Sequence, residues 1–142
     1  MKRTTLIFIC VIIATCLIGC SSSNENIQWA LNLKAGDIEG IEAVCMPSGE
    51  NERYKDYEKA DFARIVEIVN SAKGKKVDNP EEITGGALTF YITMLDGTRH
   101  TFSNNGNVYL VIDGVTFKAA YGWLSSWGDE KLNNKIPDNF VY

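Results

Sequence analysis

His100 and Cys45 are the side chains whose types could support nucleophilic chemistry. His100 is the chain's single histidine, and a serine or thiol nucleophile would have to use it, because either group needs an adjacent base at neutral pH. It falls within a segment of alternating polar and apolar residues, which predicts a partly buried, hydrogen-bonded histidine on a strand. Cys45 alternates in phase with Ile41 and Ala43, which favours a small buried side chain over a nucleophile. We therefore assign no catalytic residue.

Metal and acid–base sites are weakly indicated. Structural zinc needs about four Cys or His ligands, and no zinc-protease, nucleophile-elbow, phosphate-loop or calcium-loop motif is present. We expect no metal and no cofactor. Glycosidase chemistry needs two carboxylates about 5–10 Å apart, and no spacing in the sequence places two across a cleft. The available acids, interpreted as surface charge, are Glu39, Glu42, Asp61, Glu67, Glu81, Glu82 and Asp96.

Aromatic residues are the remaining candidates for a binding surface. Tyr91 and Tyr109 lie out of phase with the apolar residues of their segments, and Trp123 and Trp127 stand four residues apart. Flat rings give a partner contact area at low entropy cost. Core packing is the preferred interpretation for the tryptophans. The alternative is an exposed aromatic surface for a sugar or protein partner, formed by Tyr91, Tyr109, Trp123 and Trp127.

The first twenty residues carry a targeting pattern. A basic start, Met1-Lys2-Arg3, is followed by an uncharged and mainly apolar stretch over residues 4–18. As a helix, these residues would span about 22 Å, less than the roughly 30 Å hydrocarbon core of a bilayer. The pattern therefore predicts a secretory signal rather than a membrane-spanning helix. The stretch ends in Leu17-Ile18-Gly19-Cys20.

This ending resembles the lipobox of bacterial lipoprotein precursors, in which an obligatory cysteine follows Gly or Ala and two aliphatic or small residues. The resemblance covers only about the first twenty residues. It implies that the signal, residues 1–19, is removed by cleavage between Gly19 and Cys20. It also implies that Cys20 carries diacylglycerol through a thioether, with a second acyl signal making attachment lasting. The protein would then be extracytoplasmic and lipid-anchored, with the choice between inner and outer membrane open.

Removal of the signal changes the charge and the thiol count. The whole chain has a net charge of −4, and loss of Lys2 and Arg3 leaves 12 basic against 18 acidic side chains. This excludes the basic footprint of a nucleic-acid binder and predicts a body that stands off an anionic leaflet. Cys45 becomes the one thiol besides Cys20, so no internal disulfide is expected. Residues 20–26 form a polar tether reaching at most about 20 Å.

Hydrophobic periodicity predicts the elements of the remaining chain, residues 27–142, as a single domain of 45% hydrophobic composition overall. Alternation predicts strands over residues 26–33 and 38–46. An apolar stripe of period 3.6 predicts the main helix over residues 57–73, and residues 74–86 are expected to be irregular. Four strands of a meander follow, near residues 87–95, 98–103, 108–113 and 114–120, and then a short helix over residues 121–127.

Two registers are open for the first hairpin of this meander. A two-residue turn at Asp96-Gly97 pairs Tyr91 with Phe102, whereas a three-residue loop with Gly97 in the left-handed region pairs Phe90 with Phe102. The second register is preferred because it keeps one face apolar. For the second hairpin, a two-residue turn at Asp113-Gly114 places Ile112 opposite Val115 and is preferred because the hydrophobic residues then match.

These elements predict an α+β fold: a mostly antiparallel sheet, with a meander of about four strands and one or two N-terminal strands, packed on one main helix. Its general look resembles small uncharacterised lipoproteins of Gram-positive bacteria. The leading hypothesis is a non-enzymatic binding or interaction module that is anchored to the membrane through Cys20 and takes an unknown protein or glycan ligand. One alternative is a hydrolase of envelope glycan or peptide using carboxylates or His100. The other is an accessory subunit or inhibitor of another envelope protein.

Overall fold

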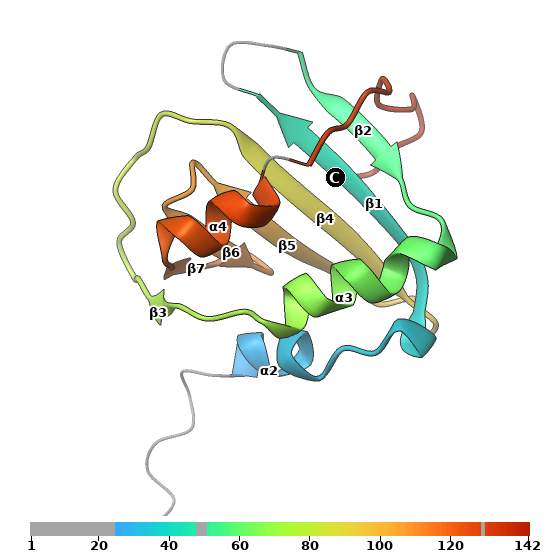
Figure 1. Cartoon of the computed structure of the whole chain (residues 1–142), viewed down its shortest axis with the longest axis horizontal. Coiled ribbons are helices and arrows are strands. Elements are labelled where there is room, and N and C mark those ends of the chain that lie inside the picture. The colour runs from blue at the N-terminus through green and yellow to red at the C-terminus, as the bar shows by residue number, and fades with distance from the viewer. Residues whose placement is uncertain (1–24, 48–50, 129) are drawn as a thin grey trace, which may run out of the picture.

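The computed structural model describes residues 25–47, 51–128 and 130–142 (Figure 1). Gly19 and Cys20, with the predicted cleavage and lipidation, lie outside these ranges. The described elements, in chain order, are α2 (Glu25–Asn32), the 3-10 turn η1 (Ala35–Asp37), β1 (Ile38–Met46), β2 (Arg53–Asp56), the 3-10 turn η2 (Lys59–Asp61), α3 (Phe62–Asn70), β3 (Lys75–Lys76), β4 (Ala87–Met94), β5 (Arg99–Asn105), β6 (Tyr109–Ile112), β7 (Val115–Lys118) and α4 (Tyr121–Gly128).

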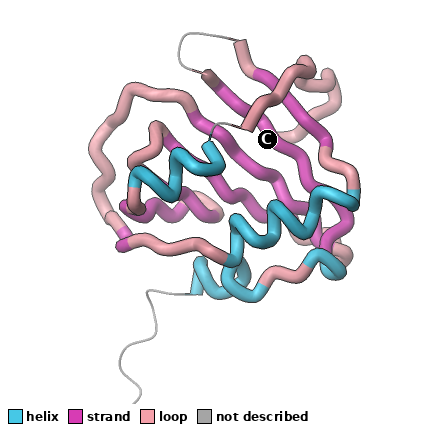
Figure 2. Tube along the Cα trace, viewed as in Figure 1, coloured by secondary structure: helices cyan, strands magenta, loops and turns pink. Residues whose placement is uncertain are grey.

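The described strands form one antiparallel sheet in the order β2-β1-β4-β5-β6-β7-β3. Helices α3 and α4 lie over one face of it, and α2 lies beside α3 at one end (Figures 1 and 2). The predicted α+β class with a mainly antiparallel sheet is confirmed. None of the helices within the described ranges is long and apolar enough to cross a membrane.

Both predicted hairpin registers are confirmed. Phe90 pairs with Phe102, across a loop in which Gly97 has a φ of 85°. Ile112 pairs with Val115, across a two-residue turn in which Asp113 and Gly114 both have positive φ. That conformation matches the twist of a hairpin. In the first hairpin, the alternative register, which pairs Tyr91 with Phe102, would have turned Phe102 away from the core.

The strand predicted over residues 26–33 is wrong, because the segment forms helix α2. Ile27, Ala30 and Leu33 are buried, whereas Leu31 is exposed. The buried positions recur every three residues, which is helical spacing, and the helix lets them pack into the same core as α3. The period-two alternation of Ile27, Trp29, Leu31 and Leu33 was compatible with either structure until a packing partner decided it.

Two short strands and a helix boundary also differ from expectation. β2 and β3 were not predicted, because their sequences, RYKD and KK, are polar and too short to show a period. The main helix is shorter than residues 57–73. It consists of η2 followed by α3, and α3 ends at Asn70. Edge strands of this kind are held by backbone pairing to a neighbour rather than by an apolar pattern.

Apolar side chains occupy both faces of the sheet. The helix-covered face contributes Phe90, Phe102 and Phe117 to the main core, each almost completely buried. A smaller cluster on the opposite face contains Val44, Tyr54 and Tyr91 and is covered by residues of the C-terminal segment. That segment passes along the free edge of β2, where Tyr54 and Asn134 exchange backbone hydrogen bonds of 2.8 and 3.2 Å. The last residues of the chain thus lie across the face that the helices leave uncovered.

Candidate functional site

A hollow on the helix-covered side concentrates charged groups. Its volume is about 600 Å³, and it lies where β2, α3 and the chain after α4 come together. Lys55 comes from β2, Arg64 from α3, and Glu130 and Lys131 from the segment after α4. Trp127, at the end of α4, also lines it. We call these five residues the Glu130 hollow.

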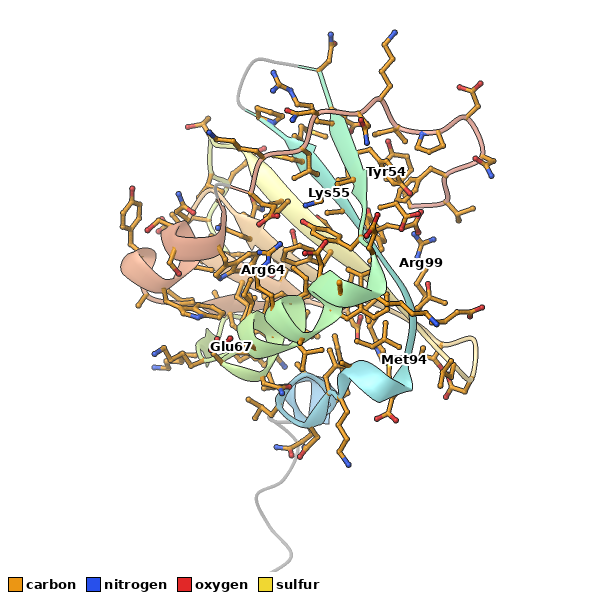
Figure 3. All side chains as sticks on the ribbon, turned by 45° about the vertical axis from the view of Figure 1, so that its right-hand side comes forward. Tyr54, Lys55, Arg64, Glu67, Met94 and Arg99 are labelled. Carbon is orange, nitrogen blue, oxygen red and sulfur yellow. The ribbon has the colours of Figure 1, made fainter. Side chains whose placement is uncertain are left out.

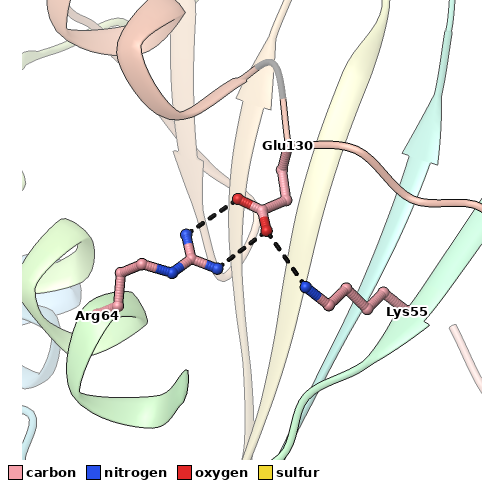
Figure 4. A network of polar contacts seen from close by, with 3 residues as sticks. All are labelled: Lys55, Arg64 and Glu130. Carbon is pink, nitrogen blue, oxygen red and sulfur yellow. Dashed lines mark hydrogen bonds and ion pairs between the residues drawn. The ribbon is translucent and has the colours of Figure 1, made fainter. Parts of the chain in front are cut away.

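Glu130 is the centre of its polar contacts (Figure 4). Arg64 donates from Nη1 to Oε2 at 3.0 Å and from Nη2 to Oε1 at 2.9 Å, a bidentate pair. Lys55 Nζ lies 3.5 Å from Oε1. Only 16% of the Glu130 side chain is exposed. A bidentate contact fixes the guanidinium and carboxylate planes together, so three elements distant in sequence are tied at one carboxylate.

Burial and charge act in opposite senses on this carboxylate. Burial raises the pKa of Glu130, but the hydrogen bonds and positive charge of Arg64, then a hydrogen bond from Tyr57 and the charge of Lys55, hold that pKa below its usual value. The pKa of the neighbouring Tyr57 phenol shifts in the other direction: burial first, then the charge of Glu130 and the hydrogen bond to it, raise this pKa. Glu130 is therefore ionised and Tyr57 is a neutral hydrogen-bond donor at neutral pH.

One buried donor of the hollow, Trp127 Nε1, has no hydrogen-bond partner within the described residues, and its side chain is only 5% exposed. Tyr57, 4% exposed, lies beside the hollow, where its hydroxyl interacts with the Glu130 carboxylate. Tyr57 underlies the basic groups, with Lys55 Nζ 4.3 Å and Arg64 Cζ 5.9 Å from its ring centre. A buried donor left unpaired costs about 1–3 kcal/mol, so Trp127 Nε1 would gain from an incoming acceptor.

The charges lining the hollow are mainly positive. Three cations face one carboxylate, which leaves an excess of positive charge in a chain whose net charge is −4. Lys55 and Lys131 carry further N–H donors, and the lining contains no histidine or cysteine. No group of side chains suited to a metal ion occurs within the described ranges. An anionic oxygen is the ligand atom that these donors would accept.

His100 matches the expectation of a partly buried, hydrogen-bonded residue. Its ring stacks on Trp29 with 4.0 Å between centroids, and Nδ1 lies 2.9 Å from Asp113 Oδ2. Asp113 Oδ1 accepts a hydrogen bond from the backbone N–H of Thr101 at 2.7 Å. The pair therefore links α2, β5 and the β6–β7 turn, and it lies outside the Glu130 hollow.

Cys45 is too far from His100 to form a dyad. The register places Ile92 opposite both His100 and Ile41, and Cys45 is four residues further along β1. At about 3.3 Å per residue, that is a separation of about 13 Å along the strands alone. Cys45 is half-buried and forms no disulfide.

The acids considered for glycosidase chemistry do not form a pair in the site. Glu42 is held on the opposite face, where it accepts hydrogen bonds from Tyr54 Oη at 2.7 Å and Arg99 Nη2 at 3.0 Å. Figure 3 shows Tyr54 and Arg99 on one side of the strands and Arg64 on the other. Asp61 is half-buried, and the exposed members of the set are Glu39, Glu67, Glu81, Glu82 and Asp96.

The exposed aromatic surface is a wrong prediction. Tyr91 and Tyr109 do lie on the face opposite the helices, but they are only 8% and 6% exposed. Phe140 packs edge-on against Tyr91 at 5.1 Å, and the residue 80–83 segment covers Tyr109, whose Oη accepts a hydrogen bond from Glu81 N. Trp127 is buried in the main core and Trp123 is half-buried. The alternation of apolar and polar residues assigned Tyr91 and Tyr109 to the correct face of the sheet. It could not predict that distant segments of the chain cover that face.

Sequence reasoning missed the Glu130 hollow altogether. Lys55 lies in an unpredicted strand, and Glu130 and Lys131 lie in a polar stretch without periodicity. The sequence contains one weak indication of the hollow: Arg64 is a cation directly beside Ile65, a residue of the buried apolar stripe of α3. Comparison of the chain with protein-family models, with curated proteins and with solved structures gives no match. The proposals below therefore rest on the motif at Cys20 and on the site's own chemistry.

Proposed function

We propose that this protein is a lipid-anchored, extracytoplasmic binding module without enzymatic activity, whose Glu130 hollow takes a ligand bearing a carboxylate or phosphate group. The observation that carries the ligand class is the excess of cations lining the hollow, beside Trp127 Nε1, a buried donor without a partner within the described residues. The anchoring rests on the lipobox ending at Cys20.

The anchor has a direct test. In cells, Cys20→Ser is expected to release the protein from the membrane fraction, because no acyl chain can be attached. Mass spectrometry of the wild-type protein is expected to show an N-terminus at Cys20 that carries acyl chains. An intact Met1 terminus, an unmodified Cys20 thiol, or wild-type retention of the variant in membranes would contradict the anchor.

The hollow favours an anion over a cation or a neutral ligand. Ligand oxygens could accept from Lys55, Lys131 and Trp127 Nε1 without breaking the bidentate Arg64–Glu130 pair. Hydrogen bonds to charged groups contribute about 1.5–3 kcal/mol each. Glu130 keeps Arg64 in place. Its own negative charge repels further negative charge on a ligand, which favours one small acidic group over a polyanion.

Calorimetric titration tests the ligand class. The probes are N-acetylaspartate and inorganic phosphate as anions, and N-acetyllysine methyl ester as a cation. Binding of one or both anions, but not of the cation, is expected. Lys55→Gln/Lys131→Gln is expected to weaken anion binding about tenfold or more, since one lost charged contact exceeds the 1.4 kcal/mol that a tenfold change requires. Lys59→Gln/Lys135→Gln removes the same charge away from the hollow and is the matched control.

Tyr57→Phe tests the hydroxyl beside Glu130. Because this hydroxyl interacts with the Glu130 carboxylate, its removal is expected to lower the free energy of unfolding by about 0.5–1.5 kcal/mol, while the anion contacts of Lys55 and Lys131 remain. Urea unfolding measures the change. Absence of anion binding, or equal binding by the Lys55/Lys131 and control variants, would refute the hollow as the ligand site.

The hydrolase alternative receives no comparable support. The register separates His100 from Cys45, and the acids proposed for glycosidase chemistry do not converge on the hollow. Within the bonds described, His100 serves to hold Asp113 and Trp29.

A further inference from the structure

Four lysines gather at the β3 edge of the sheet. Lys73 follows α3, Lys75 and Lys76 make up β3, and Lys118 ends β7. Lys75 pairs directly with Lys118 across the two strands, and all four side chains are exposed. Asp78 is the acidic partner described among them, 3.5 Å from Lys76 Nζ and itself 82% exposed. We call these four residues the lysine edge.

The lysine edge is held by tight backbone packing. A Cβ on Gly74 would lie 2.9 Å from Phe117 Cβ and 3.0 Å from Lys118 O, so this position accepts only glycine without movement of β7. Just after the edge, Val77 N donates to Thr116 O at 2.9 Å. Like charges on neighbouring strands repel, so their concentration on a fixed scaffold is a local cost in stability. A ligand that neutralises them would remove this cost.

The lysine edge follows the C-terminal end of α3, and helix α2 packs beside α3. Helix α2 begins at Glu25, five residues after Cys20, and five residues reach at most about 18 Å. α2 is fastened beside the C-terminal end of α3, where Asn70 Nδ2 donates to Leu33 O at 3.1 Å. Figure 1 shows α2 at the bottom of the molecule and β3 at its lower left, with the C-terminal end of α3 between them in this view. The segment carrying the lysines continues directly from α3.

We propose that the lysine edge is a membrane-contact surface that binds the headgroups of anionic phospholipids and orients the domain on the bilayer. The proposal rests on the acylation of Cys20 proposed above. It replaces the expectation that the acidic body stands off the membrane. Charges interact over about 8–10 Å at physiological ionic strength, so the patch next to the surface acts more strongly than the net charge of the far side.

A membrane fits this patch better than a soluble acidic partner because of the tether. An acyl anchor within about 18 Å of α2 keeps this end of the domain near the leaflet at all times. Once the anchor is inserted, the lysines remain near the headgroups, so no separate binding event is needed to bring them to the membrane. The remainder of the chain is acidic, with 14 basic against 18 acidic side chains in all, so contact through other faces is disfavoured.

Amine labelling on vesicles tests the proposal. The acylated protein, with its acylation verified by mass spectrometry, is inserted into vesicles of phosphatidylcholine alone or of phosphatidylcholine with phosphatidylglycerol. Labelling rates are then read for each lysine. The lysine edge is expected to react about fivefold or more slowly on the anionic vesicles, consistent with about 1 kcal/mol for each lysine near the surface. Lys59 and Lys135 are expected to react equally on both. Protection should disappear at about 1 M salt, where the screening length falls to about 3 Å.

Matched double variants provide the control. Lys75→Gln/Lys118→Gln is expected to remove most of the protection of Lys73 and Lys76 on anionic vesicles. Lys59→Gln/Lys135→Gln, with the same change in net charge, is expected to leave it intact. All four positions are exposed, and circular dichroism is expected to show an unchanged fold in both variants.

The outcomes separate this proposal from the one on which it rests. An acylated protein whose lysine edge labels equally fast on both vesicles overturns the membrane contact and leaves the anchor standing. A protein without acyl chains overturns the anchor itself. Protection seen only in native membranes, and absent from anionic vesicles, would assign the patch to a protein partner and also contradict the proposal.

Discussion

At the residue scale, Glu130 shows how one side chain can organise a site. Each of its two carboxylate oxygens accepts a hydrogen bond from the guanidinium of Arg64, and Oε1 also faces Lys55 Nζ. The carboxylate is largely shielded from water, with 16% of the Glu130 side chain exposed, whereas 46% of the Arg64 side chain is exposed. A bidentate, charge-assisted contact with one shielded partner contributes more than a fully exposed ion pair does.

Glu130→Gln is expected to lower the free energy of unfolding by about 1–3 kcal/mol at neutral pH. The pKa of Glu130 is lowered in the folded state, so its ionised form stabilises the protein above the unfolded-state value near 4. That contribution is lost as the pH falls through the folded-state pKa, so the difference between wild type and variant should narrow in acid. Urea unfolding between about pH 7 and pH 3 measures this.

The control is Glu67→Gln, an exposed position on α3, the helix that carries Arg64. It is expected to change the free energy of unfolding by less than about 0.5 kcal/mol. A gap between wild type and Glu130→Gln that stays constant across the pH range would show that the carboxylate does not titrate in the manner described.

At the scale of elements, the C-terminal segment explains how one face of the sheet is closed without a helix. Phe140 meets Tyr91 at 5.1 Å and Tyr54 at 5.5 Å between ring centres, both edge-on. Arg99 donates from Nη1 to the carbonyl oxygen of Val141 at 2.6 Å, and its guanidinium lies 5.2 Å from the Phe140 ring. These contacts hold the end of the segment, in addition to the Tyr54–Asn134 backbone pair and a hydrogen bond that Tyr142 Oη donates to Glu52 Oε2 at 2.6 Å.

Phe140→Ala is expected to destabilise the protein by about 2 kcal/mol, less than the 3–5 typical of a fully buried phenylalanine because the ring is only half-buried. It should also raise the proteolytic sensitivity of the C-terminal segment. Val141→Ala keeps the backbone carbonyl that Arg99 uses and changes a side chain that is 68% exposed, so it should behave as wild type. Equal stability of the two variants would show that the ring does not anchor the segment.

At the scale of the whole molecule, stability is concentrated in the middle of the sheet. β1, β4 and β5 have seven to nine residues each, whereas β2, β3, β6 and β7 have two to four. β4 lies between β1 and β5 and contributes Leu88, Phe90 and Ile92 to the main core. Amides there can exchange only when most of the structure opens.

Native-state hydrogen exchange is therefore expected to show its slowest amides in β4, close to the free energy of global unfolding. The amides of β3 and of the Tyr54–Asn134 bridge should exchange through local openings, at least about tenfold faster. Mass spectrometry of peptic fragments measures the order. Equal protection of β3 and β4 would contradict a sheet organised around its centre.

The sequence alone predicted the turns, the hairpin register and the main helix, because each depends on a local or repeated pattern of residues. Asp113-Gly114 and Asp96-Gly97 defined the turns because Asp113, Gly114 and Gly97 adopt positive φ at low cost. An apolar face fixed the register that pairs Phe90 with Phe102. The stripe through Ile65 and Val69 located the main helix for the same reason.

Only the tertiary structure decided what depends on a distant partner. Residues 26–33 alternate as a strand would, yet packing against α3 makes them a helix. Tyr91 and Tyr109 are covered by segments far away in the chain. Lys55, Arg64 and Glu130 carry no common pattern and meet because three elements converge. Periodicity records which face of an element is apolar, but an approach between distant segments leaves no repeat in the sequence from which it could be predicted.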